Sequence, residues 1–295
     1  EGAGALVARA GLGGMVRSDG ALELYETEAE WRAALPGWEA REAEGIVFEH
    51  RRGEGIAELQ PGLAPVFAVA TFVAGWQTVE DPHRFALALL AHAQRLGASL
   101  HRARVVSVAP GEGGARVTLD GGETIAAGHA VIAAGAWSKP LARGLGDAIP
   151  LETERGYNTT LPPGAFDLRR QLTFPGHGFV VTPIGGGVRV GGAVELGGLK
   201  RPPNFARSAA MLAKAQRFLP GLRAEGGTPW MGFRPSLPDS LPAVGPSRAS
   251  PCIIHAFGHG HLGLTQSAAT GRLVSDLVAG RAPALDIAPF SPQRF

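Results

Sequence analysis

The stretch FGHGHLGLTQSAATG, residues 257–271, places four glycines, two histidines and two threonines within fifteen positions. It follows the apolar run CIIHAF (252–257) and precedes a segment with helical spacing that ends at Gly280. A strand, a glycine-rich loop and a helix are therefore predicted. The glycines would let the backbone run against a ligand or adopt a positive φ, and the helix N-terminus would suit an anionic atom. A glycine-rich turn without a ligand is the alternative.

The composition of the chain limits the classes of protein to which it can belong. It has 295 residues, 45% hydrophobic and 18% charged, which predicts a globular protein of one large or two ordinary domains. A net charge of +2 without a basic run gives no indication of nucleic-acid binding. The single cysteine, Cys252, excludes an internal disulfide and a thiolate zinc cluster. The sequence contains no apolar stretch of about 18 residues, so no membrane-spanning helix is predicted.

The segment before residue 150 alternates helix and strand patterns. VEDPHRFALALLAHAQRLGASL (79–100) is the clearest predicted helix, with Asp81 as its cap, Pro82 in its first turn and Gly97 at its end. HAVIAAGAW (129–137) is a continuous apolar run and is predicted as a strand buried on both faces. Between them, three short strands joined by glycine turns predict an antiparallel meander at 105–108, 115–119 and 124–126.

From residue 150 to 198 the pattern changes to strands separated by glycine turns, which predicts a large antiparallel sheet. An α/β pattern stands on both sides of it, at 80–148 and 237–295. The fold class is therefore predicted as α/β, with an α+β part, and with two interleaved domains rather than two consecutive ones.

Four stretches of the sequence are informative together: RARVVSV (102–108), VIAAGAWS (131–138), GFRPSLPDSLPAVG (232–245) and GHGHLGLTQSAATGRLVSDLVAG (258–280). They resemble the D-amino-acid oxidase family of FAD-dependent amine oxidoreductases, in particular bacterial D-amino-acid dehydrogenases, D-hydroxyproline dehydrogenases and glycine oxidase. Their order and spacing are similar to the family pattern over nearly all of the chain.

The resemblance implies a Rossmann-like FAD-binding domain interleaved with an antiparallel-sheet substrate-binding domain. The FAD-binding domain would comprise 1–20, 80–148 and 237–295, and the substrate-binding domain 21–79 and 149–236. The family opens with a strand, a GxGxxG loop and a helix. EGAGALVARAGLGG (1–14) instead has the pattern of a helix end with a glycine-rich exit. We therefore expect the opening βαβ unit to be missing from this sequence, which leaves open whether this chain alone binds FAD.

The resemblance also implies where FAD binds. Val105 would pack beside the adenine, and Ala134, Gly135 and Trp137 would lie near the pyrophosphate and ribose. The glycine-rich loop would run against the isoalloxazine, with the following helix directed at its N1–C2=O edge. The loop candidates are Gly258, His259, Gly260, Leu262, Gly263 and Thr265. Non-covalent binding is expected, because Phe233 and Arg234 stand where some sarcosine oxidases carry a flavin-linked cysteine.

Two residues are candidates for substrate binding. Arg234, in the Arg-Pro-x-x-Pro-Asp pattern, would hold the carboxylate of an amino acid through two parallel hydrogen bonds. Tyr157, in ERGY, would add a second contact from the antiparallel sheet. The alternatives are a surface arginine in a proline-rich loop and a tyrosine at a strand edge with its hydroxyl in water.

The histidines at 255, 259 and 261 have spacings that could suggest a metal site. They span a strand and a loop, however, and no carboxylate lies close to them in sequence. No metal site is therefore predicted.

The resemblance implies an FAD-dependent oxidative deamination or dehydrogenation of a D-amino acid or small imino acid. Hydride would pass from Cα to flavin N5 without a catalytic side chain, and a quinone or oxygen would accept the electrons. The alternatives are a sarcosine- or glycine-type amine oxidase, and a non-catalytic fragment or subunit that keeps the fold without flavin. A cytoplasmic location is expected, with the periphery of the inner membrane as the alternative.

Overall fold

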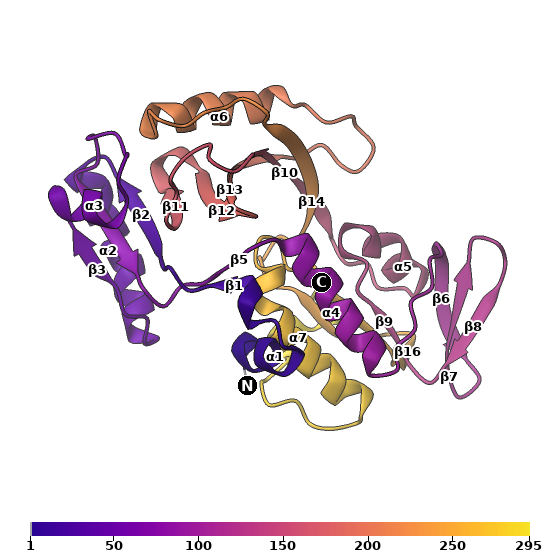
Figure 1. The fold of residues 1–295 in the computed structure, drawn as a ribbon. Coiled ribbons are helices and arrows are strands. Elements are labelled where there is room, and N and C mark those ends of the chain that lie inside the picture. The colour runs from indigo at the N-terminus through magenta and orange to yellow at the C-terminus, as the bar shows by residue number, and fades with distance from the viewer. Residues whose placement is uncertain (1) are drawn as a thin grey trace.

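An eight-stranded sheet is the largest element of the computed structural model, which describes residues 2–295 (Figure 1). Its strand order is β14-β10-β13-β12-β11-β2-β4-β3. Two separate segments of the chain supply these strands: β2 (Ala21–Tyr25), β3 (Glu49–Arg51), β4 (Val69–Val73), then β10 (Glu152–Leu161), β11 (Gln171–Phe174), β12 (Phe179–Ile184), β13 (Gly187–Glu195) and β14 (Thr228–Ser236).

The strands within 150–198 pair antiparallel, as predicted, but the sheet also contains one parallel pair, with a strand from outside that segment. β11 and β2 run parallel, with Gln171 opposite Ala21, and the other pairs of this sheet are antiparallel. The parallel pair joins the two segments of the chain, which are too far apart in sequence to be connected by a hairpin. A turn pattern could therefore not indicate its direction.

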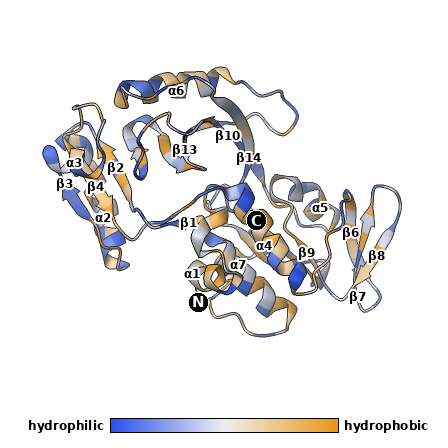
Figure 2. Ribbon diagram, viewed as in Figure 1, coloured by the Kyte–Doolittle hydropathy of each residue, from blue (hydrophilic) through white to orange (hydrophobic). Residues whose placement is uncertain are grey.

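Helix α6 (Ala206–Phe218) covers one face of this sheet. Phe218 of α6 packs against Phe174 and Phe179, whose stacked rings lie 4.4 Å apart. Figure 2 shows hydrophobic and hydrophilic residues mixed along α6, as expected of a helix with one buried side. At the other end of the sheet, α2 (Glu28–Ala43) begins at a capping box formed by Thr27 and Glu30, and α3 (Glu54–Leu59) follows β3.

A smaller sheet of order β15-β16-β9 lies in the other half of the molecule. It consists of β15 (Ala243–Ser247), β16 (Ser250–Phe257) and β9 (Ala130–Ile132), and β9 is parallel to β16. Helices α5 (Ser138–Gly144) and α7 (Gly263–Val278) follow β9 and β16 in the chain. The prediction of a long strand buried on both faces at 129–137 is wrong, because β9 has three residues at the edge of the sheet and Val131 is 42% exposed.

The remaining elements agree with the sequence pattern. The meander is formed by β6 (Val105–Gly111), β7 (Gly114–Leu119) and β8 (Thr124–Ala127), and the first helix is α1 (Ala3–Ala10). Helix α4 (Pro82–Arg95) is capped as predicted, since Asp81 Oδ1 accepts hydrogen bonds from the N–H groups of His83 and Arg84. A short pair, β1 (Val16–Arg17) with β5 (Thr78–Val79), lies where the chain passes twice between the two sheets. The assignment of domains stays a prediction.

None of the helices within residues 2–295 is both long enough and apolar enough to cross a membrane.

Candidate functional site

The loop between β16 and α7 has the backbone conformation that its glycines suggest. Gly258 and Gly260 have φ angles of +89° and +54°, a region that side chains with a Cβ rarely adopt. A Cβ at Gly258 would also lie 2.6 Å from Leu237 Cδ1, so packing within the protein explains this glycine. At Gly260 the nearest atom to such a Cβ would be Ser236 Oγ at 3.6 Å, which leaves room beside the loop.

Helix α7 begins without a side-chain cap. Leu262 occupies the N-cap position, where its side chain cannot accept a hydrogen bond, and the first turn carries no acidic residue. Gly263 and Thr265 lie in this turn, and Thr265 is exposed. The first N–H groups of the helix are therefore free to bind an acceptor or an anion from outside the helix.

A cavity of about 310 Å³ lies between this loop and the larger sheet. It brings together four loop residues predicted from the sequence with residues of β10 and β14 that were not predicted. The lining residues are Glu154, Ser236, Leu237, Ser240, Gly258, His259, Gly260, His261 and Leu262. Near the cavity, Gly260 N–H donates to Pro235 O at 2.7 Å, which fixes the loop against the end of β14.

Arg234 lies beside this cavity on β14, directly opposite Glu154 of β10. Its Nη1 donates to Ala193 O at 3.1 Å, and within residues 2–295 no carboxylate lies within ion-pair distance of its guanidinium. Burial lowers the pKa of Arg234, and the nearby charge of Glu154 partly opposes this effect. A Cβ at Gly156 would overlap the guanidinium, so the absence of a side chain at that position makes room for it. The remaining N–H donors can bind an anion.

Glu154 and His261 form a contact that the sequence did not predict. His261 Nε2 lies 2.8 Å from Glu154 Oε2, across 107 residues of chain. The hydrogen bond from His261 holds the pKa of Glu154 below its usual range, and the Ser236 hydroxyl and Arg234 act in the same direction. Glu154 is therefore ionised near neutral pH and accepts the hydrogen bond, so His261 Nε2 carries the proton.

The structure does not bring Tyr157 to Arg234. Successive side chains of a strand point to opposite faces, and Tyr157 lies on the face of β10 that packs against the α6 side of the sheet. Its ring is buried, its hydroxyl donates to Glu195 Oε2 at 2.5 Å, and the same hydroxyl accepts from Asn204 N–H. The prediction of a substrate contact from Tyr157 is not supported by this position.

Three other candidates lie at the carboxyl end of β9. Because β9 and β16 are parallel neighbours, the loop that starts at Ala133 and the loop that starts at Gly258 leave the same edge of the smaller sheet. Ala134 precedes Gly135, whose φ is +55°, and Trp137 is 57% exposed with its ring edge-on to Phe233. Val105 instead opens β6 in the meander. The individual roles of all these residues in binding FAD stay predictions.

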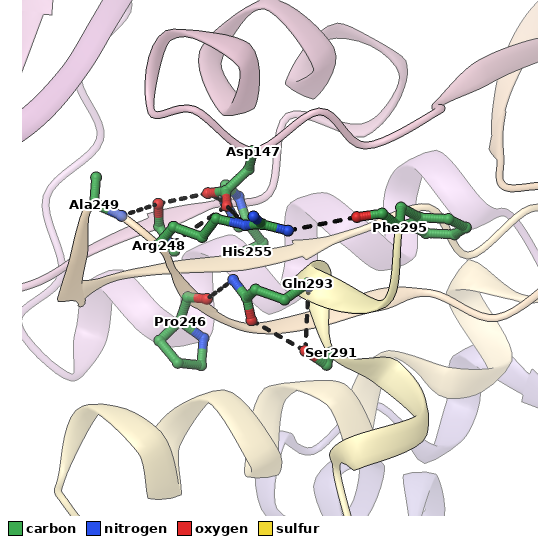
Figure 3. A network of polar contacts seen from close by, with 9 residues as sticks. Asp147, Pro246, Arg248, Ala249, His255, Ser291, Gln293 and Phe295 are labelled. Carbon is green, nitrogen blue, oxygen red and sulfur yellow. Dashed lines mark hydrogen bonds and ion pairs between the residues drawn. The ribbon is translucent and has the colours of Figure 1, made fainter.

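A buried serine, histidine and aspartate meet at the smaller sheet, and Figure 3 shows Asp147 and His255 of this group. Ser247 Oγ lies 2.5 Å, and His255 Nε2 2.8 Å, from the same Oδ2 of Asp147. The aspartate is thus at the centre, unlike a nucleophilic triad, in which the histidine links serine and aspartate. The three histidines also have separate partners: Asp147 for His255, Thr270 for His259 and Glu154 for His261.

Comparison with known proteins establishes the family. Residues 4–277 match the profile described as DAO, FAD dependent oxidoreductase. The chain belongs to this family. The resemblance inferred from its motifs is therefore confirmed.

Members of the DAO family match over nearly the whole chain. A D-amino-acid oxidase of Bradyrhizobium diazoefficiens is 36% identical over 298 residues, covering 98% of this chain and 70% of that protein. A D-amino acid dehydrogenase of Sinorhizobium medicae is 30% identical over 288 residues, covering 95% of this chain and 68% of that protein. The crystal structure of glycine oxidase from Geobacillus kaustophilus superimposes with a TM-score of 0.89 at 26% identity, covering 99% of this chain and 80% of that one.

The local structure fits the FAD that the DAO family implies. The positive-φ glycine at 260 leaves room beside the loop, and the uncapped start of α7 offers N–H groups to a polar or anionic edge of a ligand. Both features lie beside the cavity that Glu154 and Ser236 line from the sheet. The chain is therefore an FAD-dependent amino-acid oxidoreductase of the DAO family.

Proposed function

We propose that the chain oxidises the α-amino group of a D-amino acid or small imino acid, with FAD bound non-covalently. The observation that carries this proposal is Arg234, a half-buried guanidinium beside the cavity, with free donors and no carboxylate of residues 2–295 within ion-pair distance. An amino acid supplies the missing anion through its α-carboxylate, which a guanidinium binds through two parallel hydrogen bonds.

Different residues around the cavity would bind the substrate and the cofactor. Arg234 would hold the substrate carboxylate and thereby orient Cα, while the loop at 258–263 and the first N–H groups of α7 would hold the flavin edge. Bound FAD supplies the acceptor for the hydride that leaves Cα. The amine binds deprotonated, so its lone pair assists departure of the hydride and the product is an imine. The imine hydrolyses to a 2-oxo acid and ammonia, or remains a cyclic imine when the substrate is cyclic.

Substitution of Arg234 tests the substrate class. Arg234→Ala should lower kcat/KM for D-amino acids, and the loss should correspond to about 2–5 kcal/mol of transition-state stabilisation, because the bound carboxylate loses its partner. The rates are measured with a dye acceptor. Arg234→Lys should restore little, since an ammonium cannot form the two parallel bonds. Simple amines without a carboxylate should show no such loss.

Arg207→Ala is the matched control. Arg207 belongs to α6 on the opposite side of the same sheet, where it lies 3.6 Å from Glu195, so its removal should leave kcat/KM unchanged. Equal losses for amino acids and plain amines in Arg234→Ala would assign Arg234 to structure rather than to recognition. A substrate panel that includes glycine, sarcosine and both enantiomers of alanine then separates the D-amino-acid proposal from a glycine- or sarcosine-type activity.

A further inference from the structure

The charges around the cavity go beyond what binding of an α-carboxylate requires. Arg234 supplies one positive charge, which the substrate carboxylate would neutralise. Glu154 then remains as an ionised carboxylate in the wall of the cavity, 28% exposed at its side chain. A wall with this charge distinguishes substrates by the charge of their side chain.

His261 holds the Glu154 carboxylate in place from the opposite wall. The imidazole belongs to the glycine-rich loop and the carboxylate to the sheet, and both residues line the cavity. One carboxylate oxygen, Oε2, is engaged by His261 Nε2. The hydrogen bond thus holds the carboxylate at the cavity.

A second acceptor lies on the same face of the sheet. Asn158 follows Glu154 by four positions on β10, and Gly156 lies between them on that face. Asn158 is 9% exposed, and its Oδ1 has no hydrogen-bond partner in the part of the chain that the structure describes. A buried acceptor without a partner is costly, and a donor on a ligand would satisfy it.

We propose, on the basis of the function proposed above, that Glu154 selects the substrate by charge and favours a D-amino acid with a cationic side chain. The side chain of such a substrate carries several N–H donors, which match the Glu154 carboxylate in the wall of the cavity. An acidic side chain would instead meet a like charge in the cavity. His261 is a positioning residue that holds the carboxylate.

The experiment compares D-arginine, D-methionine and D-glutamate with the holoenzyme. The wild-type protein should have the highest kcat/KM for D-arginine and the lowest for D-glutamate. Glu154→Gln should lower the ratio of kcat/KM for D-arginine over D-glutamate by about tenfold or more, because one charge is removed near the ligand. His261→Gln leaves the carboxylate in place and should preserve the order of the three substrates.

Binding without turnover gives a second readout. The affinities of 5-guanidinopentanoate and glutarate, which lack an α-amino group, should be measured by calorimetry for each variant. Glu154→Gln should reduce the ratio of affinities for 5-guanidinopentanoate over glutarate. The reduction should be similar to that of the ratio of kcat/KM for D-arginine over D-glutamate. Glu152→Gln is the matched control, because this exposed carboxylate lies on the same strand but does not line the cavity.

The outcomes separate this inference from the proposed function. Oxidation of D-methionine that depends on Arg234, with an unchanged arginine-to-glutamate ratio in Glu154→Gln, would overturn the charge selection alone. An equal loss of the preference for D-arginine over D-glutamate in Glu154→Gln and His261→Gln would show that this preference depends on the position of the loop. That result would also overturn the charge selection by Glu154. A wild-type holoenzyme that oxidises no amino acid would instead refute the proposed function.

Discussion

The imidazole Nε2 of His255 lies 2.8 Å from Oδ2 of Asp147, and both side chains are fully buried although 108 residues separate them. The aspartate follows α5 and the histidine belongs to β16, so their contact ties the smaller sheet to the connection that leads into β10. Ser247 Oγ and the N–H of Arg248 also donate to this carboxylate (Figure 3). The group is therefore a structural network that holds β15 and β16.

Removal of the Asp147 charge should destabilise the fold. Asp147→Asn replaces one carboxylate oxygen with an NH₂ donor, so either the Ser247 and His255 donors that share Oδ2 or the N–H of Arg248 on Oδ1 loses its acceptor. This loss should cost about 2–4 kcal/mol of unfolding free energy. Denaturant unfolding measures the loss. Asp120→Asn, at an exposed turn after β7, is the matched control and should change stability by less than about 0.5 kcal/mol. Equal stabilities of the two variants would contradict the structural role.

The same carboxylate should make stability depend on acid pH. Burial raises the pKa of Asp147, but the hydrogen bonds from Ser247, His255 and Arg248 outweigh it and hold the pKa below its usual range. The folded pKa is thus lower than the unfolded one, so the contribution is fully present above the unfolded value, about pH 4, and is lost as the pH falls through the folded value. The melting temperature of Asp147→Asn should accordingly fall less steeply than that of the wild type below about pH 4. Parallel profiles would show that Asp147 titrates normally.

The glycine-rich loop should control flavin binding. Gly260→Val places a branched Cβ at a φ of +54° and into the space beside the loop, so the protein should lose bound FAD and its absorbance near about 450 nm. Gly113→Val is the matched control, because Gly113 has a φ of +70° and open space around it in the meander. The two variants should show similar backbone strain, but only Gly260→Val should lose flavin. Full flavin content in both would place the cofactor elsewhere.

Local signals in the sequence indicated the parts of the fold that depend on neighbouring residues. Asp81 before Pro82 predicted the start of α4, and the glycine loop between an apolar run and a helical pattern predicted β16 and α7. The apolar run at 129–137 misled because its composition matches a buried strand, whereas the backbone turns into a 3₁₀ helix at Gly135 after three strand residues.

The contacts that form the candidate site depend on tertiary structure. Glu154 and His261 meet across 107 residues, one in ERGY and the other in the glycine-rich loop, and no local pattern connects these two stretches. The position of Tyr157, three residues after Glu154, could not be predicted from the sequence either. Alternation along β10 separates its face from that of Glu154, but only the packing of α6 decides which face is turned away from the cavity.

Substitution of Tyr157 distinguishes a structural role from a role in substrate binding. Tyr157→Phe removes the hydroxyl that donates to Glu195 and accepts from Asn204 N–H, while the ring keeps its place in the core. Stability should fall by about 1–2 kcal/mol, because Glu195 and the Asn204 amide lose a partner. KM for D-amino acids should stay within about twofold of the wild-type value, since less than about 0.4 kcal/mol of substrate binding is affected. A tenfold rise in KM at unchanged stability would instead show that the Tyr157 hydroxyl contacts the substrate, which would require the sheet to present its other face to the cavity.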